Sequence, residues 1–273
     1  MFPPRRIVCL TEETVETLYL LGEEDRIAGI SGYTVRPPRA RREKPRVSAF
    51  ISADIPKILA LEPDLVLAFS DIQAEIVHDL VKAGVNVHAF NQRTLAEILD
   101  MIVMLGALTG KEPEARLLVD RLNEGMAKVA NASAALPLRP RVYFEEWDEP
   151  AISGIAWVSE LIALAGGDDV FGDLADRRSA KDRIVTYEEV AARKPDLIIG
   201  SWCGKKFRPE KVSARPEFAG LSAIRDGALH EIKSPIILQP GPASLTEGLE
   251  ALRGIIHARA HELAGSRSGE TVA

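Results

Sequence analysis

The residues best suited to ligand binding in this sequence are aromatic side chains that follow predicted strands. Four short apolar runs read as buried strands, and each is followed within three residues by an aromatic side chain. Ligands of open α/β sheets bind outside the carboxyl ends of the strands, so we predict that these aromatics lie at ligand-binding ends. Such surface suits a bulky, flat and largely apolar ligand. The residues are Tyr33 after strand 26–30, Phe69 and Ser70 after strand 65–68, Trp147 after strand 142–144, and Trp202 and Cys203 after strand 197–200.

Other patterns that could support chemistry are weaker. His257 and His261 lie four residues apart on one helical face and could bind a metal, but that face also carries Glu250 and Arg253 and is interpreted as solvated. There is no glycine-rich dinucleotide fingerprint, no P-loop and no nucleophile elbow. We therefore predict no catalytic residue and no metal site.

A basic segment, residues 36–46, holds six arginines and lysines in eleven positions. It could hold phosphate or carboxylate groups, and a solvated, proline-stiffened loop is the alternative. Arg36 stands apart from the rest of the segment because it closely follows Tyr33 and a strand end.

The composition is that of a folded globular protein. The chain has 273 residues, of which 46% are hydrophobic and 27% charged, so it can bury a core. Its net charge of −6 argues against nucleic acid as a partner. The longest apolar stretch, residues 101–108, is far below the roughly 20 residues of a membrane span. Two cysteines, Cys9 and Cys203, make no disulfide framework, and their redox state stays open.

Strand-like and helix-like segments alternate along the chain, which predicts an α/β fold with mostly parallel sheets. The second half repeats landmarks of the first. Glu62-Pro-Asp-Leu-Val-Leu-Ala68 matches Lys194-Pro-Asp-Leu-Ile-Ile-Gly200, and each copy follows a predicted helix. A second pair, ending at Gly22 and Gly167, occurs in the same order. The repeat indicates two similar α/β lobes.

Residues 94–135 contain no strand signal and separate the two halves. Apolar residues recur at helical spacing from Ala115 to Val129, which predicts one long helix of about 20 residues, or 30 Å, joining the lobes. The predicted organisation is an N-terminal lobe over 1–93, linking helices over 94–137 and a C-terminal lobe over 138–273.

The order of these landmarks resembles a known family. The sequence runs from a helix ending at Gly22 through Gly29-Ile-Ser-Gly-Tyr33, Leu61-Glu-Pro-Asp64 and the long helix to Ala165-Gly-Gly-Asp-Asp169 and Lys194-Pro-Asp196. This order is similar to that of the cobalamin and ferric-siderophore substrate-binding proteins of ABC importers, which are class III, helical-backbone metal receptors. Trp147-Asp-Glu-Pro150 looks more like the cobalamin branch. The resemblance implies two Rossmann-like lobes joined by one backbone helix, with the ligand in a cleft between them.

The resemblance also implies roles for residues of this chain. The expected ligand is a cobalamin-like corrinoid, held without catalysis or a covalently bound cofactor. Polar partners for its peripheral amides would be Arg36, Ser70, Asp71 and Glu146. The apolar walls would be Tyr33, Phe50 and Phe69 in the first lobe and Trp147, Trp157, Trp202 and Cys203 in the second.

The permease-docking residues and the cellular compartment agree less well with the family than the order of landmarks does. Family members dock onto a permease through one acidic residue on each lobe. Glu75 fits the first position, whereas the second appears as Leu238-Gln-Pro-Gly241 with no carboxylate. The sequence as written shows no signal peptide, which predicts a cytoplasmic protein, or a periplasmic one if a leader was removed. We expect the protein to be a monomer. The alternatives are a ferric-siderophore or haem binder, and a cofactor-processing, chelatase-like enzyme that would rely on His88 and Glu146.

Overall fold

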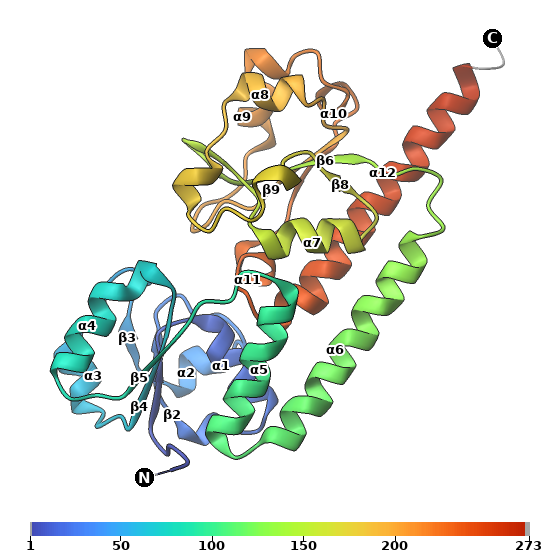
Figure 1. The fold of residues 1–273 in the computed structure, drawn as a ribbon. Helices are drawn as coiled ribbons and strands as arrows, with labels where there is room; N and C mark the ends of the chain where they lie inside the picture. The colour runs from blue at the N-terminus through green and yellow to red at the C-terminus, as the bar shows by residue number, and fades with distance from the viewer. Residues whose placement is uncertain (1, 271–273) are drawn as a thin grey trace. The chain divides into compact units, whose positions relative to one another are not determined.

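The computed structural model describes residues 2–270 and divides into two compact units, each built on its own sheet. Unit 1 contains residues 1–92, 96–122 and 239–242, and unit 2 contains residues 93–95, 123–238 and 243–273. The helix α6 (Glu112–Ser133) belongs to unit 1 as far as Leu122 and to unit 2 from Asn123. The predicted connection through one long helix is present (Figure 1).

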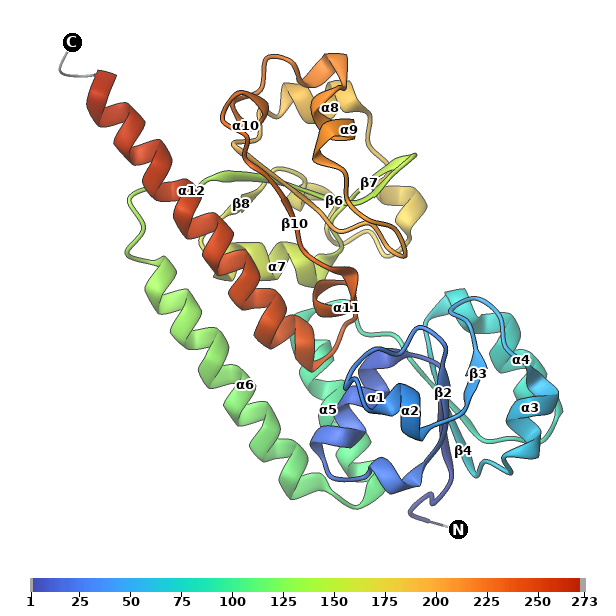
Figure 2. The ribbon, with the colours of Figure 1, turned by 180° about the vertical axis from the view of Figure 1, so that it is seen from behind.

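The sheet of unit 1 is fully parallel, with strand order β3-β2-β1-β4-β5. Helices α3 and α4 cover one face, and α1 and α5 cover the other (Figures 1 and 2). The strands are β1 (Ile7–Cys9), β2 (Ile27–Ser31), β3 (Arg46–Ser48), β4 (Leu65–Phe69) and β5 (Val87–Phe90). The helices are α1 (Glu12–Leu20), α2 (Ala40–Glu43), α3 (Ile55–Ala60), α4 (Ala74–Lys82) and α5 (Leu95–Thr109), with 3₁₀ turns η1 (Glu24–Arg26) and η2 (Asp71–Gln73).

The sheet of unit 2 has the order β10-β9-β6-β7, with β8 also paired to β6. Helices α8, α9 and α10 lie on one side of it and α7 and α12 on the other (Figures 1 and 2). The strands are β6 (Arg141–Asp148), β7 (Ala151–Ser153), β8 (Asp168–Asp169), β9 (Leu197–Gly200) and β10 (Leu229–Glu231). The helices are α7 (Ala156–Leu164), α8 (Tyr187–Ala192), α9 (Pro209–Ser213), α10 (Ser222–Arg225), α11 (Ser234–Ile237) and α12 (Leu249–Glu270). Shorter turns are η3 (Gly172–Leu174), η4 (Ala180–Arg183), η5 (Pro216–Phe218) and the π-helical η6 (Ser244–Gly248).

One local prediction differs from the structure. Strand β6 continues to Asp148 and pairs antiparallel with β7, so Trp147 lies within a strand and not after one. The sequence Trp-Asp-Glu-Pro reads as a loop, and only the partner strand reveals that it forms a hairpin. Thr11 occupies the N-cap of α1; its hydroxyl donates to Glu13 Oε1 at 2.5 Å and accepts no backbone N–H of the helix.

Candidate functional site

The carboxyl edge of the unit 1 sheet is held together by one buried side chain, Gln73. Its Oε1 accepts the Phe69 N–H at 2.9 Å, and its Nε2 donates to the Phe50 carbonyl at 2.8 Å. Ser70 has a left-handed backbone with φ 57°, its N–H donates to the Phe90 carbonyl at 2.7 Å, and its hydroxyl accepts the Ile72 N–H. The loops after β3, β4 and β5 are therefore fixed relative to one another.

This edge presents apolar side chains to solvent. Tyr33, Ile51 and Ile72 follow β2, β3 and β4, and they are 59%, 74% and 50% exposed. Large apolar residues exposed at the carboxyl ends of parallel strands make this edge a candidate ligand-binding surface. The sequence analysis named Tyr33 for this edge and did not name Ile51 and Ile72, which lie three residues after the ends of β3 and β4.

The other predicted residues of unit 1 have different environments. Phe69 is only 5% exposed and belongs to the core, Phe50 is half-buried, and Asp71 is exposed. Glu75 is exposed in the first turn of α4. The Arg36 guanidinium donates to Glu16 Oε1 at 3.0 Å, so this arginine is held at the face of α1.

Beside that arginine the first turn of α1 carries two buried carboxyls. Burial is the main cause that raises the pKa of Glu12 to about 8 and that of Glu13 to about 7, and repulsion from Glu16 adds to it. The Val35 N–H and the Thr11 hydroxyl act in the opposite direction. Gly241 packs so closely here that an added Cβ would lie 2.5 Å from the Glu13 Cβ.

In unit 2 the indole of Trp202 belongs to a buried polar network. Glu145, fully buried, accepts both guanidinium nitrogens of Arg215 at 2.6 and 3.0 Å. The same carboxylate accepts the Trp202 indole N–H at 3.0 Å and the Tyr143 hydroxyl at 3.1 Å. Since all these partners converge on one carboxylate, Trp202 is fixed and only 4% exposed.

Trp147 is joined to this region by a lysine. The Lys205 Nζ lies 4.1 Å from the ring centroid of Trp147 and 5.1 Å from that of Trp202. The Lys205 ammonium is paired with Asp148, and the second carboxylate oxygen of Asp148 lies 2.9 Å from Lys211 Nζ. Burial raises the pKa of Asp148, but the two lysines outweigh it and lower the pKa overall. The structure thus brings the rings of both tryptophans close to one lysine ammonium.

The remaining predicted residues of unit 2 are spread out. Trp157 is 3% exposed and donates its indole N–H to the Ile237 carbonyl at 2.9 Å. Glu146 accepts the buried Arg183 guanidinium at 2.7 Å. Cys203 is exposed as a residue. Partial desolvation of its thiol, together with the charge of Glu146, raises the pKa of the thiol.

A cavity of about 300 Å³ opens at the carboxyl ends of β9 and β10. The loop after β9 supplies Trp202, Lys205 and Lys206, and the loop after β10 supplies Lys233. Glu231 accepts Lys233 Nζ at 2.6 Å, and the nearby Lys233 and Lys206 help to hold its pKa below the ordinary range although burial acts to raise it. The other lining residues are Gly204, Ile232 and Ser234.

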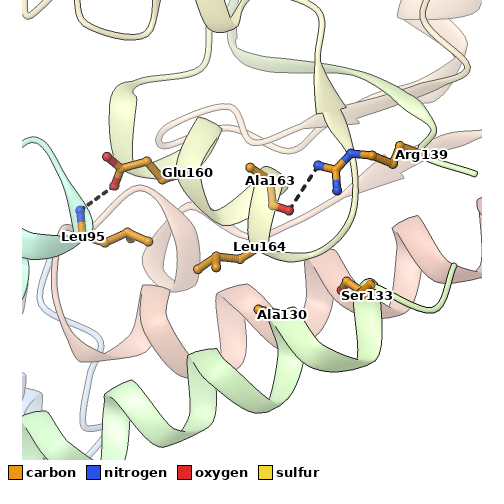
Figure 3. Close-up of a pocket in the computed structure, with 8 residues that line it drawn as sticks. Leu95, Ala130, Ser133, Arg139, Glu160, Ala163 and Leu164 are labelled. Carbon is orange, nitrogen blue, oxygen red and sulfur yellow. Dashed lines mark hydrogen bonds between the residues drawn. The ribbon is translucent and has the colours of Figure 1, made fainter.

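A second cavity of unit 2, about 430 Å³, lies where the end of α6 meets α7 (Figure 3). Its polar groups already have protein partners. Glu160 accepts the Leu95 N–H at 2.7 Å, Ser133 bonds His257 Nε2 at 3.0 Å, and Arg139 donates to Asp168 at 2.8 Å and to the Ala163 carbonyl. Because no polar group is left to orient a ligand, we place the candidate site elsewhere.

The described residues, 2–270, carry neither a recognisable metal centre nor a helix suited to a bilayer. No group of three or more histidine, cysteine or acidic side chains in that range could hold a metal ion. Of the helices in that range, none is both long and apolar enough to span a bilayer. His88, named for the enzyme alternative, packs edge-on against the Phe90 ring with centroids 4.3 Å apart.

Solved structures place this architecture in a defined class. The periplasmic haem-binding protein of Roseiflexus sp. RS-1 superimposes with a TM-score of 0.81 at 19% identity, covering 94% of this chain and 99% of the other. The periplasmic vitamin B12-binding protein of Vibrio cholerae superimposes with a TM-score of 0.75 at 23% identity, covering 94% and 98%. The fold is that of the two-lobed periplasmic binding proteins with a connecting helix.

Sequence comparison then identifies the family. Residues 7–236 match the family described as "Periplasmic binding protein", so the chain belongs to that family. The vitamin B12-binding protein of V. cholerae is 26% identical over 254 residues, covering 89% of this chain and 86% of the relative. A cobalamin-binding protein of Halobacterium salinarum is 25% identical over 199 residues, covering 72% of this chain. The chain spans about half the length, 53%, of that archaeal relative.

Proposed function

We propose that this protein binds a cobalamin-like corrinoid as the substrate-binding component of an ABC importer. The observation that carries the proposal is the exposed apolar surface of Tyr33, Ile51 and Ile72 at the carboxyl edge of unit 1. A folded protein gains by covering such a surface, and a flat macrocycle with apolar faces covers it without a matching set of charges. The relatives named for cobalamin or vitamin B12 support this choice of ligand.

The polar residues at the same edge would orient the ligand. Asp71 is exposed there, and the Ser70 hydroxyl lies at the same turn. The corrin ring carries peripheral amides, which both donate and accept hydrogen bonds. We assign these residues to binding and orientation, with no proton transfer or bond cleavage.

A haem or ferric-siderophore ligand is the second candidate, and one observation favours it. Lys205, Lys206 and Lys233 line the cavity of unit 2, and anionic chelates are attracted by such a set of cations. The structural likeness to a haem-binding protein is compatible with it.

We further propose that Glu75 contacts the permease of that importer, and that the protein acts in the periplasm or at the cell surface. A second contact follows from the internal repeat. Glu75 lies in the first turn of the helix after β4, and Glu210 lies in the first turn of α9, the helix after the corresponding strand β9. Both side chains are exposed. Glu210 would therefore provide the second acidic contact with the permease, for which the stretch 238–241 has no carboxylate.

The direct test is titration of the purified protein with cyanocobalamin, haem and a ferric siderophore, followed by calorimetry and tryptophan fluorescence. We expect cyanocobalamin to bind with a Kd at or below the micromolar range. The variant Ile72→Ser, at the exposed edge, should weaken binding about five- to thirtyfold, because burial of one such side chain contributes about 1–2 kcal/mol. Val81→Ser on α4, 57% exposed and away from that edge, is the matched control. Absence of cyanocobalamin binding would refute the corrinoid proposal, and binding of haem alone would replace it with the second candidate.

A further inference from the structure

The cavity at the carboxyl ends of β9 and β10 is positively charged. Its lining includes three lysines and one glutamate, a formal charge of +2. The Lys233 ammonium is already paired with Glu231 at 2.6 Å, and that of Lys205 with Asp148. Within the described chain, the Lys206 ammonium makes no hydrogen bond or ion pair. One cation at this site therefore makes no direct ion pair, although it lies close enough to the Glu231 carboxylate to lower the pKa of that group.

The walls of the cavity are rigid on one side. Trp202 is held by Glu145, and its ring packs edge-on against Phe207 with centroids 5.0 Å apart. The Phe207 N–H donates to Glu231 at 3.2 Å, which ties the loop after β9 to the end of β10. A charged pocket with a fixed backbone loses little entropy when a ligand group enters it.

The ammonium of Lys205 extends the positive field toward Trp147. Its Nζ is held over that ring at 4.1 Å, so the indole face that would stack on a neutral ring is partly covered by a cation. An apolar edge of a ligand gains nothing from this charge, whereas an anionic group is attracted by it.

From this arrangement we infer that the cavity is an anion subsite, which takes a phosphodiester or carboxylate group of the bound ligand against Lys206 and Lys233. The inference rests on the proposed function, because the anion belongs to the ligand that the importer carries. In a complete cobalamin the group is the phosphodiester of the nucleotide loop, and in haem it is a propionate. Lys206 provides a cation that makes no direct ion pair, and Lys233 either leaves Glu231 or contacts Glu231 and the ligand anion together.

The test compares ligands with and without the anion. Dicyanocobinamide lacks the nucleotide loop of cyanocobalamin and with it the phosphodiester, whereas haem dimethyl ester differs from haem only in its esterified carboxylates. We expect Lys206→Gln and Lys233→Gln each to weaken binding of the anionic member of a pair about fivefold, as for the loss of one charge-assisted contact. Binding of the member without the anion should change less than twofold. Lys128→Gln, an exposed lysine of α6 in unit 2, removes the same charge elsewhere and is the control.

The outcomes separate the two proposals. If cyanocobalamin binds and neither lysine variant affects it more than Lys128→Gln does, the anion subsite is refuted and the corrinoid proposal stands. If no corrinoid binds but haem does, with the lysine effect seen for haem and not for its ester, the subsite stands and the corrinoid proposal falls. If no chelate binds, titration with inorganic pyrophosphate tests whether the cavity binds an anion at all. Amide NMR shifts confined to residues 202–207 and 231–234 would support the subsite, and their absence would overturn it.

Discussion

Asp64 and Asp196 make the same contacts in the two units. Asp64 accepts the Arg6 N–H at 3.0 Å and returns its own N–H to the Arg6 carbonyl at 3.0 Å. Asp196 does the same with Arg141, at 2.9 and 2.8 Å. The residues two positions earlier, Glu62 and Lys194, share a left-handed backbone with φ 48° and 46°. The Pro-Asp repeat is thus a structural device that fastens the end of a helix to the first strand of each sheet.

Loss of either aspartate should destabilise the protein to a similar extent. Asp64→Ala and Asp196→Ala each leave a strand-leading N–H without its acceptor, which costs about 1–2 kcal/mol. Urea denaturation measures the free energy of unfolding. Asp79→Ala on the exposed face of α4 should change it by less than about 0.5 kcal/mol. A neutral result at one site and a loss at the other would contradict the equivalence of the two copies.

This repeat explains how much of the fold could be predicted from the sequence. Pro-Asp before an apolar strand is a local pattern, so the strands, helices and two-lobed organisation follow from short stretches. The partners of Glu145 could not be predicted, because Arg215 lies 70 residues away and Trp202 57 residues away. For the same reason the aromatic residues predicted after strands could not be sorted into the exposed Tyr33 and the buried Phe69 and Trp202.

Removal of one partner of the buried ion pair should be far more damaging than removal of both. Arg215→Met leaves Glu145 charged, fully buried and without its main counter-ion, which costs about 3–5 kcal/mol. The double variant Arg215→Met with Glu145→Leu should recover more than half of that loss. Guanidinium denaturation followed by Trp202 fluorescence provides the comparison. Equal losses in single and double variants would show that the ion pair, and not the stranded charge, accounts for the stability.

The buried carboxyls of α1 should make stability depend on pH. Burial raises the pKa of Glu12 to about 8 and that of Glu13 to about 7, so the folded state keeps protons that the unfolded state loses near pH 4.5. The free energy of unfolding should therefore fall as pH rises from about 4.5 to about 8 and level off above that. The other groups that face these carboxyls are Glu16, Arg36 and Thr11.

The variant Glu12→Gln tests this effect. It should be more stable than the wild type at pH 8.5 by at least about 1 kcal/mol, because one unit of pKa shift corresponds to about 1.4 kcal/mol. It should also be less dependent on pH, as measured by urea denaturation at half-unit intervals. Glu124→Gln, an exposed residue of α6, is the control and should follow the wild-type curve. A wild-type stability that rises between pH 5 and pH 8 would contradict the assignment.

The loop that carries Trp202 depends on the absence of a side chain at the end of β9. A Cβ on Gly200 would lie 2.0 Å from the Phe207 ring, so Gly200→Ala must displace that ring and the Trp202 that packs on it. We expect a loss of about 1–3 kcal/mol in stability, as for other overpacked cores, and a shifted Trp emission maximum. Gly172→Ala, where nothing lies within 4 Å of the added Cβ, is the matched control. An unchanged emission spectrum in Gly200→Ala would mean that the Phe207 ring moves without Trp202.

The acidic pair proposed for permease contact predicts a separation of binding from transport. Glu75→Arg and Glu210→Arg reverse charges on exposed first turns, and neither side chain is among those assigned to the ligand. We expect each variant to bind corrinoid with unchanged affinity but to lower ATP-driven uptake by the cognate importer in liposomes at least tenfold. Like charges placed opposite each other at an interface cost several kcal/mol. Glu124→Arg makes the same charge change on α6 and should transport normally. If Glu75→Arg blocks uptake and Glu210→Arg does not, the second contact lies elsewhere in unit 2 and the internal repeat does not extend to the docking surface.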